Sequence, residues 1–135
     1  MSRTSRVASL SLLALPLVLS AVAQISAAEP PIKRTPLQRF DVPGTAYETV
    51  IGIAEIAPGV TIGRHTHPGP ESGYLFSGGF ELLIDGQAPR LLKAGDSYQV
   101  PAGAVHDAKA GSEGAKVIAT YVVQKAQPLA TPATP

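Results

Sequence analysis

Short runs of alternating apolar and polar residues fill the middle of the chain, and Gly, Pro or Asp interrupts each of them. No stretch of this region shows a persuasive helical period, so the pattern predicts strands. The expected strands are 47–57, 60–67, 73–78, 80–85, 89–93, 97–100, 104–110 and 115–123. About eight short strands with close turn signals predict an all-β fold, but their number alone does not separate an immunoglobulin-type sandwich from a jelly roll.

The N-terminus has the layout of a secretory signal peptide. Two arginines precede an apolar run over residues 7–22, and small residues follow. A-x-A patterns place cleavage after Ala23 or Ala28, so residues 1–28 are predicted to be a leader. The alternative is a transmembrane anchor, but the run is short for a span, contains Pro16 and lacks a basic stop-transfer flank. We expect export, with a Gram-negative periplasm as the compartment and no stable membrane anchor after cleavage.

The rest of the chain has room for one domain. Residues 29–36 are Pro-rich and are predicted to be an extended linker. Residues 37–125 carry the strand pattern and form the predicted domain. Residues 126–135 are rich in Pro, Thr and Ala, a composition that predicts a disordered tail.

Charge and cysteine content narrow the function classes. Removing the two arginines of the leader leaves nine basic against ten acidic residues, a net charge of about −1. Nucleic-acid binding requires a strong basic excess, so we expect no nucleic-acid partner. The chain has no cysteine, so a metal site would have to use His and carboxylate ligands.

The chain has three histidines, and two of them are one residue apart in the stretch GVTIGRHTHPGPESGYLFSG. His65 and His67 point the same way if this stretch is a strand, because side chains alternate between the faces. A Pro-Gly-Pro turn follows and can bring Glu71 back beside them. If the strand that carries His106 lies next to this one, three imidazoles and one carboxylate surround a point, a ligand set that suits a divalent first-row metal.

These residues resemble a known family. The stretch from Gly59 matches the first cupin motif, G-x5-H-x-H-x3-E-x6-G, at every fixed position. GDSYQVPAGAVHDAKA matches the second motif, G-x5-P-x-G-x2-H-x3-N, up to Ala110, which stands in place of Asn. Nine of the ten fixed positions agree, in the required order, over residues 59–110.

The resemblance implies a cupin double-stranded β-helix, a jelly-roll barrel with a metal near one mouth. His65, His67, Glu71 and His106 map onto the four metal ligands of the family. Fe or Mn is the expected metal, with Ni, Cu or Zn as alternatives. The strand faces that carry the ligands also carry small residues, which predicts an open cavity for a small organic molecule.

Two functions remain open. The first is a metal-dependent oxidoreductase, dioxygenase-like, that acts on a small phenolic, diketone or carboxylate substrate and in which the metal carries most of the chemistry. The second is a non-catalytic cupin that binds a metal or a small molecule. Tyr98 is expected in packing, with a hydrogen bond to substrate as its alternative role. The apolar runs 50–57 and 117–123 have two apolar faces, so we expect a homodimer with one of them in the interface.

Overall fold

The computed structural model describes residues 28–134, which form eight strands and no helix. In chain order the strands are β1 (Ile32–Asp41), β2 (Tyr47–Ile56), β3 (His65–Thr66), β4 (Glu71–Ile84), β5 (Arg90–Lys93), β6 (Ser97–Val100), β7 (His106–Gln124) and β8 (Thr131–Pro132). The predicted all-β fold is therefore confirmed. The described part of the chain holds no helix long and apolar enough to span a membrane. The predicted leader lies outside the described residues, except for its last position.

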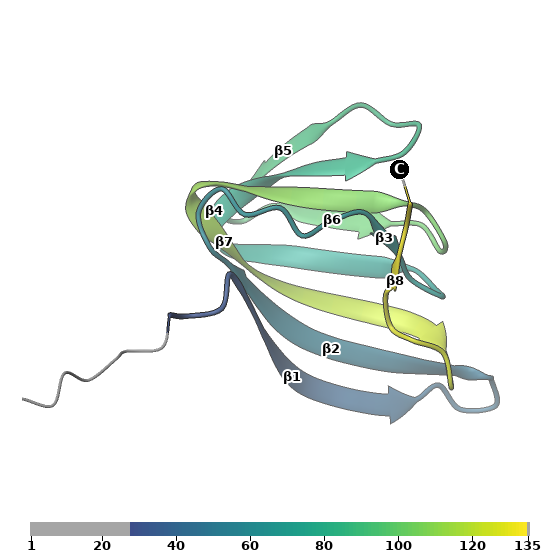
Figure 1. The fold of residues 1–135 in the computed structure, drawn as a ribbon. Helices are drawn as coiled ribbons and strands as arrows, with labels where there is room; N and C mark the ends of the chain where they lie inside the picture. The colour runs from purple at the N-terminus through teal and green to yellow at the C-terminus, as the bar shows by residue number, and fades with distance from the viewer. Residues whose placement is uncertain (1–27, 135) are drawn as a thin grey trace, which may run out of the picture.

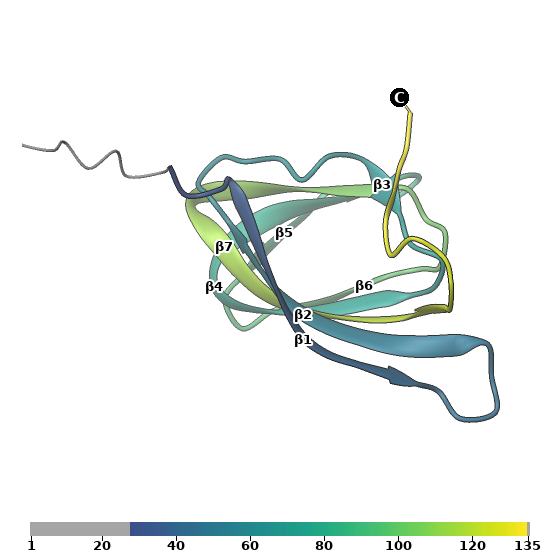
Figure 2. The same ribbon diagram turned by 60° about the horizontal axis from the view of Figure 1, so that its bottom comes forward.

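Two long strands, β4 and β7, organise the sheet, because each half of either strand pairs with different neighbours. The C-terminal half of β7 pairs with β2, and the N-terminal half of β4 pairs with β6. The other halves pair with β3 and β5 respectively, while β4 and β7 pair with each other along both halves. All these pairings are antiparallel. The sheet therefore curls into two facing layers that enclose the core, as Figures 1 and 2 show.

Both long strands change the phase of their alternation at the bend. In β4 the inward side chains stand at odd positions up to Leu75 and at even positions from Phe80 onward. Register shifts between Leu75 and Phe80 absorb the change. Gly78 lies there with a φ of 65°, and a Cβ at this position would collide with the backbone carbonyl of Gly114 in β7. Only glycine allows this close crossing, so the bend depends on it.

This change of phase explains how the predicted strands differ from the observed ones. The sequence pattern divides β4 into 73–78 and 80–85, and it divides β7 into 104–110 and 115–123. The structure keeps each pair as one bulged strand. The predicted strand 60–67 shortens to the two residues of β3, because Gly63 has a φ of 98° and interrupts it. Thr61 makes only an isolated bridge, to Lys109.

The structure corrects the expectations at both ends of the domain. The predicted linker 29–36 includes the start of β1, which pairs with β2 from Ile32 onward. The tail from residue 126, predicted to be disordered, crosses the barrel and carries β8, which pairs with β3. Figure 2 shows this tail lying beside β3. Both segments lack an apolar alternation, because nearly all of their residues are exposed, so the sequence gives no strand signal for them.

Candidate metal centre

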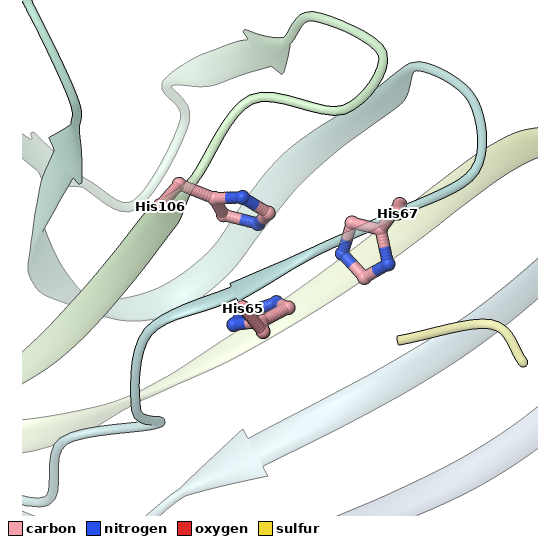
Figure 3. Close-up of side chains that lie close together, drawn as sticks. All are labelled: His65, His67 and His106. Carbon is pink, nitrogen blue, oxygen red and sulfur yellow. The ribbon is translucent and has the colours of Figure 1, made fainter. Parts of the chain in front are cut away.

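The three histidines of the chain come together at one end of the barrel. His65 lies in β3 directly opposite His106, the first residue of β7. His67 lies two residues beyond His65, on the same side of the chain (Figure 3). One ring nitrogen from each of the three side chains lies within 4.8 Å of the others. The antiparallel register of β3 and β7 thus gathers residues that are 39 to 41 positions apart in the sequence.

Backbone carbonyl groups orient all three rings in the same way. Nδ1 of His65 donates to the Gly63 carbonyl at 2.7 Å, and Nδ1 of His106 donates to the Ala104 carbonyl at 3.0 Å. Nδ1 of His67 donates to the carbonyl of Leu129, in the C-terminal tail, at 2.6 Å. A carbonyl only accepts, so each Nδ1 carries the proton and each neutral ring presents the lone pair of Nε2. This is the arrangement in which histidines ligate metal ions in proteins.

The Glu71 carboxylate, which is buried, faces two of these nitrogens. Its Oε2 lies 3.1 Å from Nε2 of His67 and 3.3 Å from Nε2 of His106. Burial alone would raise the pKa of Glu71, but the two histidines and the Tyr98 hydroxyl lower it to about 2. The carboxyl group is therefore ionised at neutral pH. The carboxylate also acts on His106, whose pKa it raises against the effect of burial.

The site passes a test of fit for a metal ion. Within residues 28–134, Nε2 of His67 is buried and has no hydrogen-bond partner. Its lone pair instead faces the carboxylate, and two electron-rich atoms at 3.1 Å need a cation or a proton between them. Three imidazoles beside a carboxylate suit a divalent first-row metal. The three-histidine cluster can therefore hold such an ion.

The turn between His67 and Glu71 is fixed on both of its sides. The Pro68 carbonyl accepts from the Gln124 amide at 3.0 Å, and the Pro70 carbonyl accepts from the Val122 amide at 3.1 Å. Both donors belong to β7. The turn thus rests on the same strand that supplies His106, which holds Glu71 in place relative to the imidazoles.

Tyr98 is a residue of this site for which the sequence analysis expected packing first. Its buried hydroxyl donates to Oε1 of Glu71 at 2.7 Å, so the second carboxylate oxygen remains directed at the histidines. The ring lies against Gly73, the partner of Tyr98 in the β4–β6 register, where any Cβ would collide with it. The alternation of 97–100 places Tyr98 on the inner face, but only the strand register shows that it reaches Glu71.

A cavity of about 670 Å³ opens beside the cluster, lined in part by His65, His67, Glu71 and His106. Two small residues from neighbouring strands, Gly52 and Ala119, stand side by side in its wall. Small residues beside the ligands were expected, and Gly63, Gly73 and Ala108 do lie near them. Aromatic rings also line the cavity. Tyr121 is one of them, and its ring lies 4.8 Å from the ring of His67.

Fold and site together define a class, a curled β-barrel with a histidine cluster at one mouth. The family model described as "Cupin domain" matches residues 52–123, and the chain belongs to that family. The predicted resemblance and the jelly-roll fold are thereby confirmed.

Several known proteins are similar to the chain. One is the dimethylsulfoniopropionate lyase DddW of Ruegeria pomeroyi, 37% identical over 67 residues, which are 50% of this chain and 43% of the lyase. The chain thus spans less than half of that relative. A cupin superfamily protein from Desulfitobacterium hafniense is 21% identical with a TM-score of 0.60 and covers 74% of this chain and 84% of that one. An oxalate oxidase in complex with the substrate analogue glycolate is 25% identical with a TM-score of 0.58, and the match covers 72% of this chain and 53% of the oxidase.

Removing the Tyr98 hydroxyl is expected to weaken the site without opening the core. In Tyr98→Phe the ring remains, but a buried charged oxygen loses its donor, so the free energy of unfolding should fall by about 1–3 kcal/mol. Mn²⁺ affinity, measured from the resonance of free Mn²⁺, should fall about tenfold, as for other outer-shell partners of metal ligands. Tyr74→Phe, which removes a hydroxyl from an exposed ring, is the control. Equal behaviour of the two variants would contradict this role for Tyr98.

Shortening the C-terminal tail is expected to weaken metal binding through His67. A chain that ends at Pro128 lacks the Leu129 carbonyl, so His67 loses the acceptor that fixes its proton on Nδ1. We expect Mn²⁺ affinity to fall by about tenfold. A chain that ends at Ala133 keeps the carbonyl and β8 and should bind like the full chain. Unchanged affinity in the shorter chain would show that the tail does not orient His67.

Proposed function

We propose that the chain is a metal-dependent cupin enzyme acting on a small organic substrate, with His65, His67, Glu71 and His106 as the metal ligands. The observation that supports this most directly is the set of Nε2 lone pairs that meet the ionised carboxylate beside a cavity. A closed structural site would not need a cavity of this volume. Fe or Mn is the proposed metal, with Ni, Cu or Zn as alternatives.

The chain's own residues hold and shield the reacting molecule. The four ligands lie at one mouth of the barrel, and the apolar side chains of β2 and β7 line much of the remaining wall. When bound, the ion supplies Lewis acidity to an oxygen of the substrate and, in the case of Fe or Mn, a redox couple. Tyr98 is occupied by Glu71, whereas the Tyr121 hydroxyl makes no hydrogen bond within residues 28–134 and can donate to a bound molecule.

The proposed reaction class is oxidation, dioxygenase-like. The similarity to an oxalate oxidase supports an oxidoreductase on a small substrate. The similarity to the lyase DddW favours a second candidate, a lyase that cleaves a small sulfonium acid such as dimethylsulfoniopropionate. A non-catalytic cupin that binds a metal or a small molecule is the third.

Three measurements on one preparation separate these candidates. The metal content of natively purified protein is determined first. Oxygen consumption is then followed with catechols, flavonols, β-diketones and oxalate, and loss of dimethylsulfoniopropionate is followed by proton NMR. We expect oxygen consumption with one of these classes, abolished in His106→Ala and retained in Lys109→Ala, an exposed position on the same strand. Sulfonium loss alone would establish the lyase. Binding without turnover would establish the third candidate, and a wild-type protein without metal would overturn the proposal.

We further propose that the protein is exported to a periplasm and works as a homodimer. The leader-like N-terminus supports export. The outer face of the sheet supports the dimer, because it aligns Ile53, Ile118 and Tyr74 across β2, β7 and β4. Phe76 packs edge-on against Tyr74, and the two are 51% and 45% exposed. Such an apolar outer face is typical of an interface.

Light scattering coupled to gel filtration tests the dimer. We expect a mass of two chains for the wild type and of one chain for Phe76→Lys, since a lysine there would put a charge into the interface. Leu91→Lys is the matched control, because Leu91 is 84% exposed but lies on β5, away from this face. A monomeric wild type would contradict the proposal, and so would a Phe76→Lys variant that stays dimeric.

A further inference from the structure

The charges that line the cavity are mostly positive. Three arginines line it (Arg34, Arg39 and Arg64), and among the described residues Glu71 is the one carboxylate in the lining. Two of the arginines are already engaged. Arg39 donates to Glu48 at 3.0 Å, and Arg64 makes two hydrogen bonds to Asp85 at 2.8 and 2.7 Å. For Arg34, no carboxylate within residues 28–134 lies at salt-bridge distance.

The strand register directs Arg34 toward the interior. Arg34 pairs with Ala54 of β2, Ala54 pairs with Val117 of β7, and Val117 pairs with the fully buried Leu75 of β4. Residues that stand opposite each other in neighbouring strands share one face of the sheet. Because Leu75 points into the core, Arg34 is on the inner face of β1, at the edge of the same sheet.

The part of the cavity wall between Arg34 and the proposed metal ligands carries only small side chains. Two positions further along β2 and β7, the register row contains Gly52 and Ala119, which leave the space above them open. The next row contains Tyr121, opposite Glu71. Both Arg34 and Tyr121 line the cavity, so the guanidinium and the phenol face the same space.

We propose that Arg34 binds the carboxylate of the substrate, so that the site accepts small organic anions whose other end reaches the histidine cluster. This inference rests on the proposed function, because it places the reacting end of the anion at the metal ligands. A guanidinium binds a carboxylate through two parallel hydrogen bonds, which fixes both the position and the direction of the ligand. Tyr121 lines the cavity in the register row of Glu71, so its hydroxyl can donate to the bound anion near the end that reaches the histidines.

Calorimetric titration of Mn²⁺-loaded protein tests the inference. The probes are ω-hydroxy carboxylates of two to five carbons and the corresponding amides, which have the same shape without the charge. We expect the wild type to prefer at least one acid over its amide. Arg34→Gln should weaken the binding of that acid about tenfold and leave the amide unchanged. Arg34→Lys keeps the charge but cannot make two parallel hydrogen bonds, so its affinity for that acid should lie between those of the wild type and of Arg34→Gln.

Arg90→Gln is the matched control, because Arg90 is exposed on β5 and does not line the cavity. Equal affinity for acid and amide in the wild type would overturn the inference, as would equal losses in Arg34→Gln and Arg90→Gln. Mn²⁺ affinity is measured separately for every variant and should not change in Arg34→Gln. A wild type that binds neither Mn²⁺ nor any of the other metals named (Fe, Ni, Cu and Zn) would overturn the proposed function itself, whereas normal metal binding without a preference for acids would overturn the inference alone.

Discussion

A buried, ionised carboxylate that faces imidazole lone pairs is the interaction on which the rest of this structure depends. Burying a charge is unfavourable unless it is compensated, and Glu71 is almost fully enclosed. Tyr98 from β6 donates a hydrogen bond to one carboxylate oxygen, and the other oxygen faces Nε2 of His106 from β7 and of His67 from the segment that follows β3, so a cation held between them would compensate the remaining charge. The barrel must therefore hold β6, β7 and the segment that follows β3 close to one side chain, which restricts their register.

The bends of β4 and β7 satisfy this restriction. Because both strands change their phase of alternation at the same crossing, Glu71 and His106 both point inward although they lie in opposite layers of the sheet. Without the bulges near Gly78, one layer would turn its inner face outward. The glycine at that crossing and the histidine cluster are thus parts of one arrangement, even though Gly78 lies in the middle of β4 and the histidines lie on other segments.

The sequence predicts the parts of this molecule that carry a local signal. The alternation of apolar residues indicates the strands, and the spacing of His65, His67 and Glu71 with a turn between them indicates a ligand set. The sequence divides β4 and β7 into two strands each at their glycines, because a bulge and a turn have the same glycine signature. The partnership of Tyr98 with Glu71 depends on the β4–β6 register, which no local pattern reports.

The elements without a pattern are the ones that set the two ends of the cavity. Nine of the ten residues of β1 are exposed, so the strand has no alternation of apolar and polar residues by which the sequence could reveal it. Arg34 nevertheless projects from β1 into the cavity lining. The tail has the composition of a disordered segment, and yet its Leu129 carbonyl orients His67. A backbone carbonyl can come from any residue, and an exposed arginine is common on any strand. The proposed metal ligands can therefore be read from side-chain identity, whereas the groups proposed to orient them and to select the substrate become visible only in three dimensions.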